Sequence, residues 1–229
     1  MRYAIYFAPM PATPLHGLGS RWLGRDAHTG EKLAQPALEE LVPLTREPRR
    51  YGFHGTLKAP FALREGIREE ALMRGCAALA ASSGTFRLRL KVDLLDGFLA
   101  LVPEDDPAPL RALAERCLRE LDGFRKPLSE EELARRRTVR LTERQDANLL
   151  RWGYPHVLDD FRFHMTLTER LDVSDAAPLA AAAAEHFAAA LRDPIAIDGI
   201  TLFEEPAAGA PFLAIRHFPF SHSSAEAAA

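Results

Sequence analysis

The segment Phe53-His54-Gly55-Thr56-Leu57 has a second copy later in the chain, Phe163-His164-Met165-Thr166-Leu167. Each copy has an aromatic residue, a histidine, a variable residue, a threonine and a leucine in the same order. Side chains of an extended strand alternate between its faces, so the histidine and threonine share one face while the aromatic residue and leucine share the other. The repeat therefore predicts two equivalent strands, each presenting an imidazole and a hydroxyl beside an apolar anchor.

The sequence that follows each copy also corresponds. Three further pairs of segments match: the helices at about 67–81 and 175–191, the strands at 86–92 and 195–203, and the strands at 98–101 and 212–215. Matching elements after both copies are typical of a duplicated structural unit. Each unit is predicted to consist of a strand, a helix, a strand and a strand.

From this repeat we predict an α+β protein with a bilobal, pseudo-two-fold duplication, in which two antiparallel sheets flanked by helices surround a central cleft. The chain is expected to form a single bilobal domain over residues 1–229. Its parts are lobe one at about 50–103 with an N-terminal strand at 3–8, a helical insertion at about 107–153, lobe two at about 160–218, and a disordered tail at 221–229. The prolines and glycines of 9–48 predict a long connection with one short helix near 36–41.

Composition sets the broad class. The chain has 229 residues, 47% hydrophobic and 27% charged, which is ordinary for a globular protein. Its net charge of −3 disfavours broad nucleic-acid binding, although a local basic pocket stays possible. Two cysteines and no apolar run near ~20 residues argue against a disulfide scaffold and a membrane span. We expect a cytoplasmic monomer without a signal peptide.

The two histidines suit acid–base chemistry on a phosphate. Imidazole titrates near neutral pH, so His54 and His164 can act as a base and an acid on opposite sides of a phosphorus atom. Thr56 and Thr166 can donate hydrogen bonds to the phosphate oxygens. A metal site would need further ligands at suitable spacing, which the sequence does not offer. No metal and no cofactor are expected.

Three other residues are candidates for substrate binding. Lys58 continues the alternation of the first motif and could neutralise phosphate, although it could equally be an exposed surface lysine. Arg162 lies two residues before His164 and shares its predicted face. Tyr3 is assigned to the cleft from the first strand; Tyr6 would then point to the opposite face.

The helical insertion carries a run of arginines, Arg135-Arg136-Arg137, followed by Arg140 and Arg144. A solvated helix surface is the ordinary interpretation of such a basic face. An anion-binding lid over the cleft is the alternative.

The two motifs with their flanks resemble the 2H phosphoesterase superfamily, which is named for two His-x-Thr motifs. The flanks include Tyr51–Phe61 and Phe161–Thr168, and they resemble a bacterial branch of phosphonate metabolism proteins of unknown function, encoded with carbon–phosphorus lyase genes. The resemblance covers nearly the whole chain. It implies metal-independent cleavage of a phosphodiester, often a cyclic one, with His54 and His164 as the acid–base pair. Gly55 departs from the superfamily, which usually has an apolar residue there.

Three functions follow from the residues and the resemblance. The first is a hydrolase acting on a small cyclic phosphate or nucleotide-like phosphodiester, with a small-molecule phosphate ester as its partner. The second is RNA end processing or 2′–5′ RNA ligase-like activity, which the acidic net charge disfavours. The third is a non-catalytic sensor of phosphate ligands.

Overall fold

The computed structural model describes residues 1–105, 107–138 and 140–223. Its strands are β1 (Arg2–Phe7), β2 (Gly55–Phe61), β3 (Gly84–Leu88), β4 (Leu90–Leu95), β5 (Phe98–Pro103), β6 (Met165–Arg170), β7 (Ile195–Ile197), β8 (Gly199–Glu205), β9 (Leu213–Pro219) and β10 (His222–Ser223). Its α-helices are α1 (Pro14–Leu23), α2 (Leu41–Leu44), α3 (Arg46–Tyr51), α4 (Glu69–Ala81), α5 (Ala108–Glu120), α6 (Glu130–Arg136), α7 (Glu143–Trp152) and α8 (Val173–Leu191).

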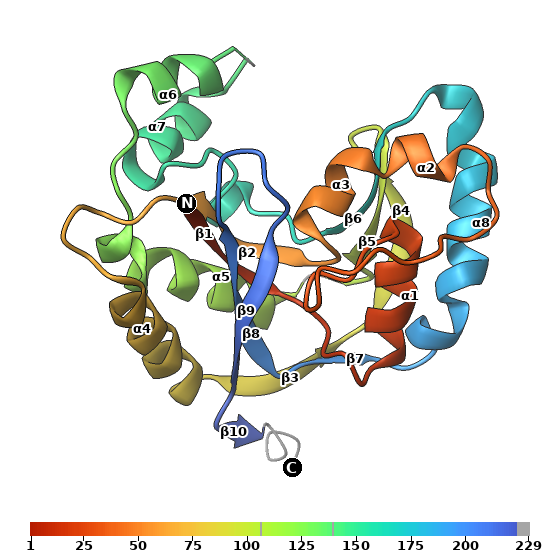
Figure 1. Cartoon of the computed structure of the whole chain (residues 1–229), viewed down its shortest axis with the longest axis horizontal. Helices are drawn as coiled ribbons and strands as arrows, with labels where there is room; N and C mark the ends of the chain where they lie inside the picture. Colours follow the sequence, from red (N-terminus) through yellow and green to blue (C-terminus); the bar gives the residue numbers. More distant parts are fainter. Residues whose placement is uncertain (106, 139, 224–229) are drawn as a thin grey trace.

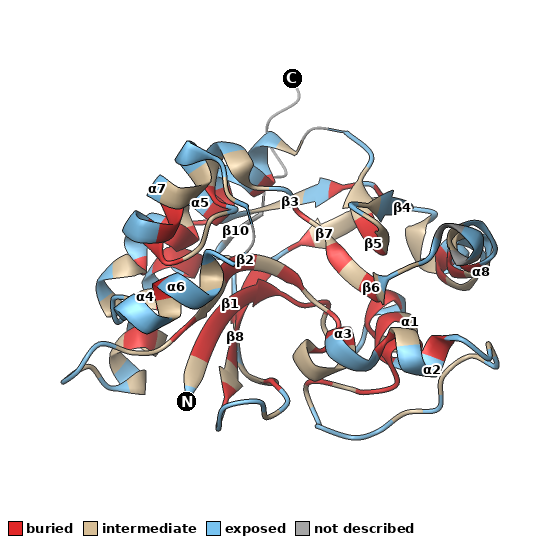
Figure 2. Ribbon diagram, turned by 90° about the horizontal axis from the view of Figure 1, so that it is seen from above, coloured by how far each residue is buried: buried red, intermediate tan, exposed pale blue. Residues whose placement is uncertain are grey.

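A seven-stranded antiparallel sheet with the order β4-β5-β6-β2-β1-β8-β9 forms the centre of the molecule (Figure 1). A three-stranded sheet with the order β10-β3-β7 accompanies it. Helices α4 to α7 gather on one side of β1 and β2, and α1, α2, α3 and α8 lie on the other (Figure 2). The prediction of an α+β protein with a large antiparallel sheet, a second sheet and flanking helices is confirmed.

The strand pairing follows a two-fold pattern. In one half β2 pairs with β1 and β1 with β8, while in the other half β6 pairs with β5 and β5 with β4. The helices follow the same two-fold pattern: α4 packs against β8, and α8 packs against β4, the equivalent strand of the other half. The halves meet where Gly55 of β2 pairs with Met165 of β6. The two motif strands therefore lie next to each other at the centre of the sheet.

This pairing corrects one correspondence that the sequence suggests. Strand β5 lies between β4 and β6 as β1 lies between β8 and β2, whereas β9 is an edge strand. Residues 98–101 are therefore equivalent to the N-terminal strand and not to 212–215. The segment 86–92 also divides into β3 and β4, which belong to different sheets. Alternation of apolar residues indicates which face a side chain occupies, but it does not identify the partner strand.

The segment between β1 and β2 is more helical than the sequence suggests. It contains α1, α2 and α3, and the predicted helix near 36–41 is wrong. Thr13 caps the start of α1, and Gly24 ends it with a φ of 77°. Gly19 inside α1 obscures the helical pattern, yet it is required because a Cβ there would lie 2.1 Å from the ring of Phe53.

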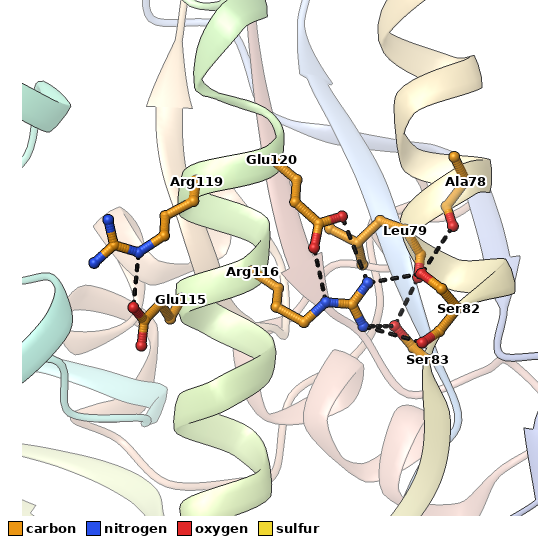
Figure 3. A network of polar contacts seen from close by, with 8 residues as sticks. All are labelled: Ala78, Leu79, Ser82, Ser83, Glu115, Arg116, Arg119 and Glu120. Carbon is orange, nitrogen blue, oxygen red and sulfur yellow. Dashed lines mark hydrogen bonds and ion pairs between the residues drawn. The ribbon is translucent and has the colours of Figure 1, made fainter.

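Helices α4 and α5 are tied together where α4 ends. Arg116 of α5 donates hydrogen bonds to Ser82 and Ser83, and also to Glu120 one turn further along its own helix (Figure 3). Multiple charge-assisted bonds from one guanidinium fix geometry better than a single ion pair does. This network holds α5 in place against β2, the strand of the first motif.

The C-terminal segment pairs with the small sheet. His222–Ser223 form β10, which is parallel to β3, whereas residues 224–229 of the expected disordered tail lie outside the described residues. Within the described part of the chain, no helix combines the length and the apolar character that crossing a bilayer requires.

Candidate active site

His54 is held at the start of β2 by three neighbours. Its Nδ1 lies 2.9 Å from the carbonyl oxygen of Gly52, and its Nε2 lies 3.2 Å from the hydroxyl of Thr56. The ring stacks on Tyr6 of β1 with 3.8 Å between the centroids. Gly52 ends α3 with a φ of 80°, a conformation that favours glycine. The end of α3 thus orients this imidazole.

His164 has the equivalent contact in the second motif. Its Nδ1 lies 2.8 Å from the carbonyl oxygen of Arg162, again two residues earlier in the chain. The edge of its ring meets Phe98 at the start of β5, with 5.5 Å between the centroids. Both histidines are half-buried. The duplication therefore reproduces the hydrogen bond of the imidazole as well as the strand.

The carbonyl contacts set the tautomer of both rings. A carbonyl oxygen can only accept, so Nδ1 carries the hydrogen and Nε2 of the neutral ring keeps its lone pair. Burial lowers the pKa of His54 to about 4 and also lowers the pKa of His164. At neutral pH both rings are therefore neutral, and each has a basic Nε2.

Two neighbouring cavities receive the motif side chains. A cavity of about 310 Å³ is lined by His164 together with Thr56, and one of about 250 Å³ is lined by His54 together with Thr166. Each cavity thus combines the histidine of one motif with the threonine of the other. The cavities adjoin at the contact between Thr56 and His54. The structure brings all four motif residues to one region of the sheet.

The lowered pKa of His54 predicts a pH dependence of stability. Its value is about 4 in the folded protein and 6.5 ordinarily, so between these values the unfolded chain binds more protons. The free energy of unfolding should therefore fall as the pH drops from 6.5 to 4, by up to about 3 kcal/mol from this residue. Chemical denaturation across this range should show that His54→Gln weakens the dependence. Equal slopes in wild type, His54→Gln and the exposed control His156→Gln would contradict the prediction.

Lys58 does not reach either of these cavities. Its amino group donates to the carbonyl of Leu118 and to Asp122, and its side chain is buried against α5. The register explains this, because Tyr6 pairs with Thr56 whereas Ile5 pairs with Lys58. The intervening β-bulge shifts the alternation and turns Lys58 to the opposite face from Thr56. The expectation that Lys58 shares the face of the motif is wrong.

Tyr3 also lies away from the motif residues. It is buried, and its hydroxyl donates to Glu69 of α4 over 2.7 Å. The strand alternation itself is as expected, with the two tyrosines of β1 on opposite faces, but Tyr6 is the one that contacts His54. The sequence could not show which face of β1 carries the site, because both tyrosines are buried.

Arg162 does line the cavity of His164. Its guanidinium is exposed and forms an ion pair with Asp96. Asp96 and Gly97 form the turn between β4 and β5 with φ values of 49° and 89°, a conformation typical of tight hairpins. The hairpin of one half therefore positions an arginine of the other half at the cavity.

Several residues at the site lie outside the set of candidates named from the sequence. Tyr154, His156 and Phe98 line the cavity of His164, and Tyr51 lines that of His54. Tyr154 and His156 lie in the segment just before the second motif, so proximity in sequence was the available signal. Within the described residues, no group of three or more His, Cys, Asp and Glu side chains is arranged to hold a metal ion.

Comparisons with known proteins provide independent information. A ribose 1,5-bisphosphate phosphokinase PhnN of Janthinobacterium sp. (strain Marseille) is 43% identical over 230 residues, covering 96% of this chain and 51% of that protein. The protein of the same name from Laribacter hongkongensis (strain HLHK9) is 42% identical over 214 residues, covering 93% of this chain and 50% of that protein. The chain thus spans about half the length of these curated relatives.

A solved structure called a phosphoesterase aligns with 96% of this chain and 98% of its own, at 14% identity and a TM-score of 0.42. Residues 56–213 match the family described as "Protein of unknown function (DUF1045)". This match includes Thr56 and the whole of the second motif. The chain belongs to this family.

Proposed function

We propose that the chain is a metal-independent phosphoesterase that opens a small cyclic phosphate, or cleaves another compact phosphodiester, by acid–base catalysis between His54 and His164. The observation that carries the proposal is the equivalent hydrogen bond of the two Nδ1 atoms to carbonyl oxygens, which leaves Nε2 as the basic atom of each ring, with the Thr56 hydroxyl beside Nε2 of His54. A structural histidine needs no such matched partner in the other half of a duplication. This arrangement supports a paired chemical role.

In the proposed reaction one Nε2 takes a proton from water as the water oxygen bonds to phosphorus. The bond from phosphorus to the leaving oxygen breaks, and the other imidazolium gives that oxygen its proton. Both rings are neutral in the free protein at neutral pH, because burial lowers their pKa. The negative charge of a bound phosphate favours the protonated form and restores an acid. The hydroxyl that now contacts Nε2 of His54 can turn to a phosphate oxygen.

The names of the curated relatives support a substrate class. They are called phosphokinases of ribose 1,5-bisphosphate. A ribose 5-phosphate that carries a 1,2-cyclic phosphate gives ribose 1,5-bisphosphate when water opens the ring at the 2-oxygen. A cyclic ribose phosphate is therefore our preferred substrate. The assignment of this activity to phosphonate metabolism rests on the resemblance of the motifs alone.

A panel of cyclic phosphates tests this function with and without EDTA. We expect turnover of cyclic ribose phosphates, followed by phosphorus NMR, at a rate that the chelator leaves unchanged. Loss of activity with EDTA and recovery with added metal would overturn the mechanism. Ligand-dependent shifts of the melting temperature without turnover would favour a sensor. Salt-sensitive binding of oligonucleotides but not mononucleotides would favour RNA processing.

A further inference from the structure

A third cavity lies beside the histidine site and is strongly basic. It has a volume of about 110 Å³, and its basic lining residues are Arg2, Lys58, Arg125, Lys126 and Arg136. Glu132 is the acidic residue of the lining. Water occupies about 30 Å³ per molecule in the liquid, so this space has room for a group of a few heavy atoms. Glu132, together with the carboxylates of Asp122 and Glu205 that pair with lining cations, leaves an excess of positive charge, which favours an anionic occupant.

Three of the five cations form ion pairs with protein carboxylates: Arg2 with Glu205, and Lys58 and Arg125 with Asp122. The amino group of Lys58 donates to the carbonyl of Leu118 and to Asp122. Arg125 donates to Asp122 and to the carbonyl of Arg151. Both side chains are buried, and these hydrogen bonds fix their positions in the wall of the cavity. These two residues supply positive potential without having to move.

Arg2 and Arg136 retain donors that the protein leaves unused. Arg2 uses its Nε for Glu205, and Arg136 uses Nη1 for the carbonyl of Gly153. Among the described residues, no hydrogen-bond partner faces Nη1 or Nη2 of Arg2, or Nε or Nη2 of Arg136. A planar guanidinium with two adjacent free N–H groups is well suited to a phosphate.

The electrostatics of Arg136 agree with this view. Burial lowers the pKa of its guanidinium; Glu132 opposes the shift and Arg2 adds to it. Arg136 differs in this from its neighbours in the basic run, since Arg137 pairs with Asp146 on the exposed surface. One arginine of the run therefore turns into a cavity, where it shares space with a second cation.

The basic cavity and the cavity of His164 have a common wall. Ala59, Tyr154 and Val157 line both of them. A small molecule that spans this wall could place one group near the histidines and another near the arginines.

We propose that this cavity, defined by Arg2, Lys126 and Arg136, binds a phosphomonoester of the substrate, so that the preferred substrate carries a second phosphate besides the one that reacts. This inference rests on the proposed function for its catalytic consequence, but the cavity should bind a sugar phosphomonoester in any case. It assigns specificity to α6, an element of the helical insertion. It also explains why an acidic protein has a concentrated basic pocket.

Binding of ribose 5-phosphate, measured by calorimetry on the full chain, tests the cavity without requiring turnover. Arg136→Leu should weaken binding about tenfold or more, the loss expected for a charge-assisted contact. Arg137→Leu is the matched control, because it removes the neighbouring exposed arginine and should leave binding unchanged. Lys126→Gln should also weaken binding. Because Lys126 is exposed, this variant provides the test if Arg136→Leu fails to fold.

Steady-state kinetics with two substrates provide a second test of the cavity. Wild type should prefer a ribose cyclic phosphate that carries a 5-phosphate over the same compound without it, through a lower KM. Arg136→Leu should reduce this preference by raising the KM for the 5-phosphorylated compound. Ribose 5-phosphate binding that is the same in wild type, Arg136→Leu and Lys126→Gln would overturn the proposal. Absence of turnover with intact, Arg136-dependent binding would overturn only the proposed function.

Discussion

Replacing either motif histidine by alanine should reduce turnover of a cyclic phosphodiester by about 10²–10⁴-fold, the range expected for loss of a general acid or base. The protein should remain folded, because both rings are half-buried and their hydrogen bonds involve only a backbone carbonyl and a threonine hydroxyl. Steady-state kinetics with circular dichroism on the same samples would measure both effects.

His156→Ala is the matched control for His54→Ala and His164→Ala. This exposed histidine lines the same cavity as His164, so the control removes an imidazole from the site but not from the motifs. The turnover of the double variant should be only slightly lower than that of the less active single variant, because the effects of residues that act as one unit do not add. If His156→Ala lost as much activity as the motif variants, or if the motif variants kept wild-type turnover, the paired mechanism would be wrong.

The repeated motif allowed the two equivalent motif strands, each followed by a helix, to be predicted, whereas the correspondence of the later strands 98–101 and 212–215 was wrong. Alternation within a strand was enough to place His54 beside Thr56, a contact of 3.2 Å in the structure. The prediction depended only on local geometry, which strand periodicity determines. The capping box that begins α6 at Ser129 depends on the same kind of local geometry.

Features that depend on the pairing of distant strands could not be predicted in this way. The bulge that redirects Lys58 exists because of its register with Ile5, and nothing in either short segment encodes it. The choice of Tyr6 over Tyr3 depends on which face of β1 receives His54. The inward turn of Arg136 depends on the carbonyl of Gly153, which follows a separate helix. In each case the deciding partner lies far away in the sequence.

Gly55 is the position where the chain departs from the expected motif, and its structural role gives the second large prediction. A Cβ at this residue would lie 2.3 Å from the ring of Phe163, the apolar anchor of the other motif. Gly55 pairs with both Phe7 and Met165, so it joins the two halves of the sheet. Its φ is not among the positive values, so alanine adds steric conflict and no backbone strain.

Gly55→Ala should therefore lower the free energy of unfolding by about 1–3 kcal/mol, as overpacking does, and should also reduce turnover because Phe163 precedes His164. Thermal and urea unfolding would measure the first effect and initial rates the second. Gly17→Ala is the matched control, since it adds the same atom inside α1 with no neighbour within 4 Å and should be neutral or stabilising. Combining Gly55→Ala with Phe163→Leu should recover part of the stability. Destabilisation that this second substitution fails to relieve would show that contact with the Phe163 ring is not the reason for glycine at the junction of the two halves.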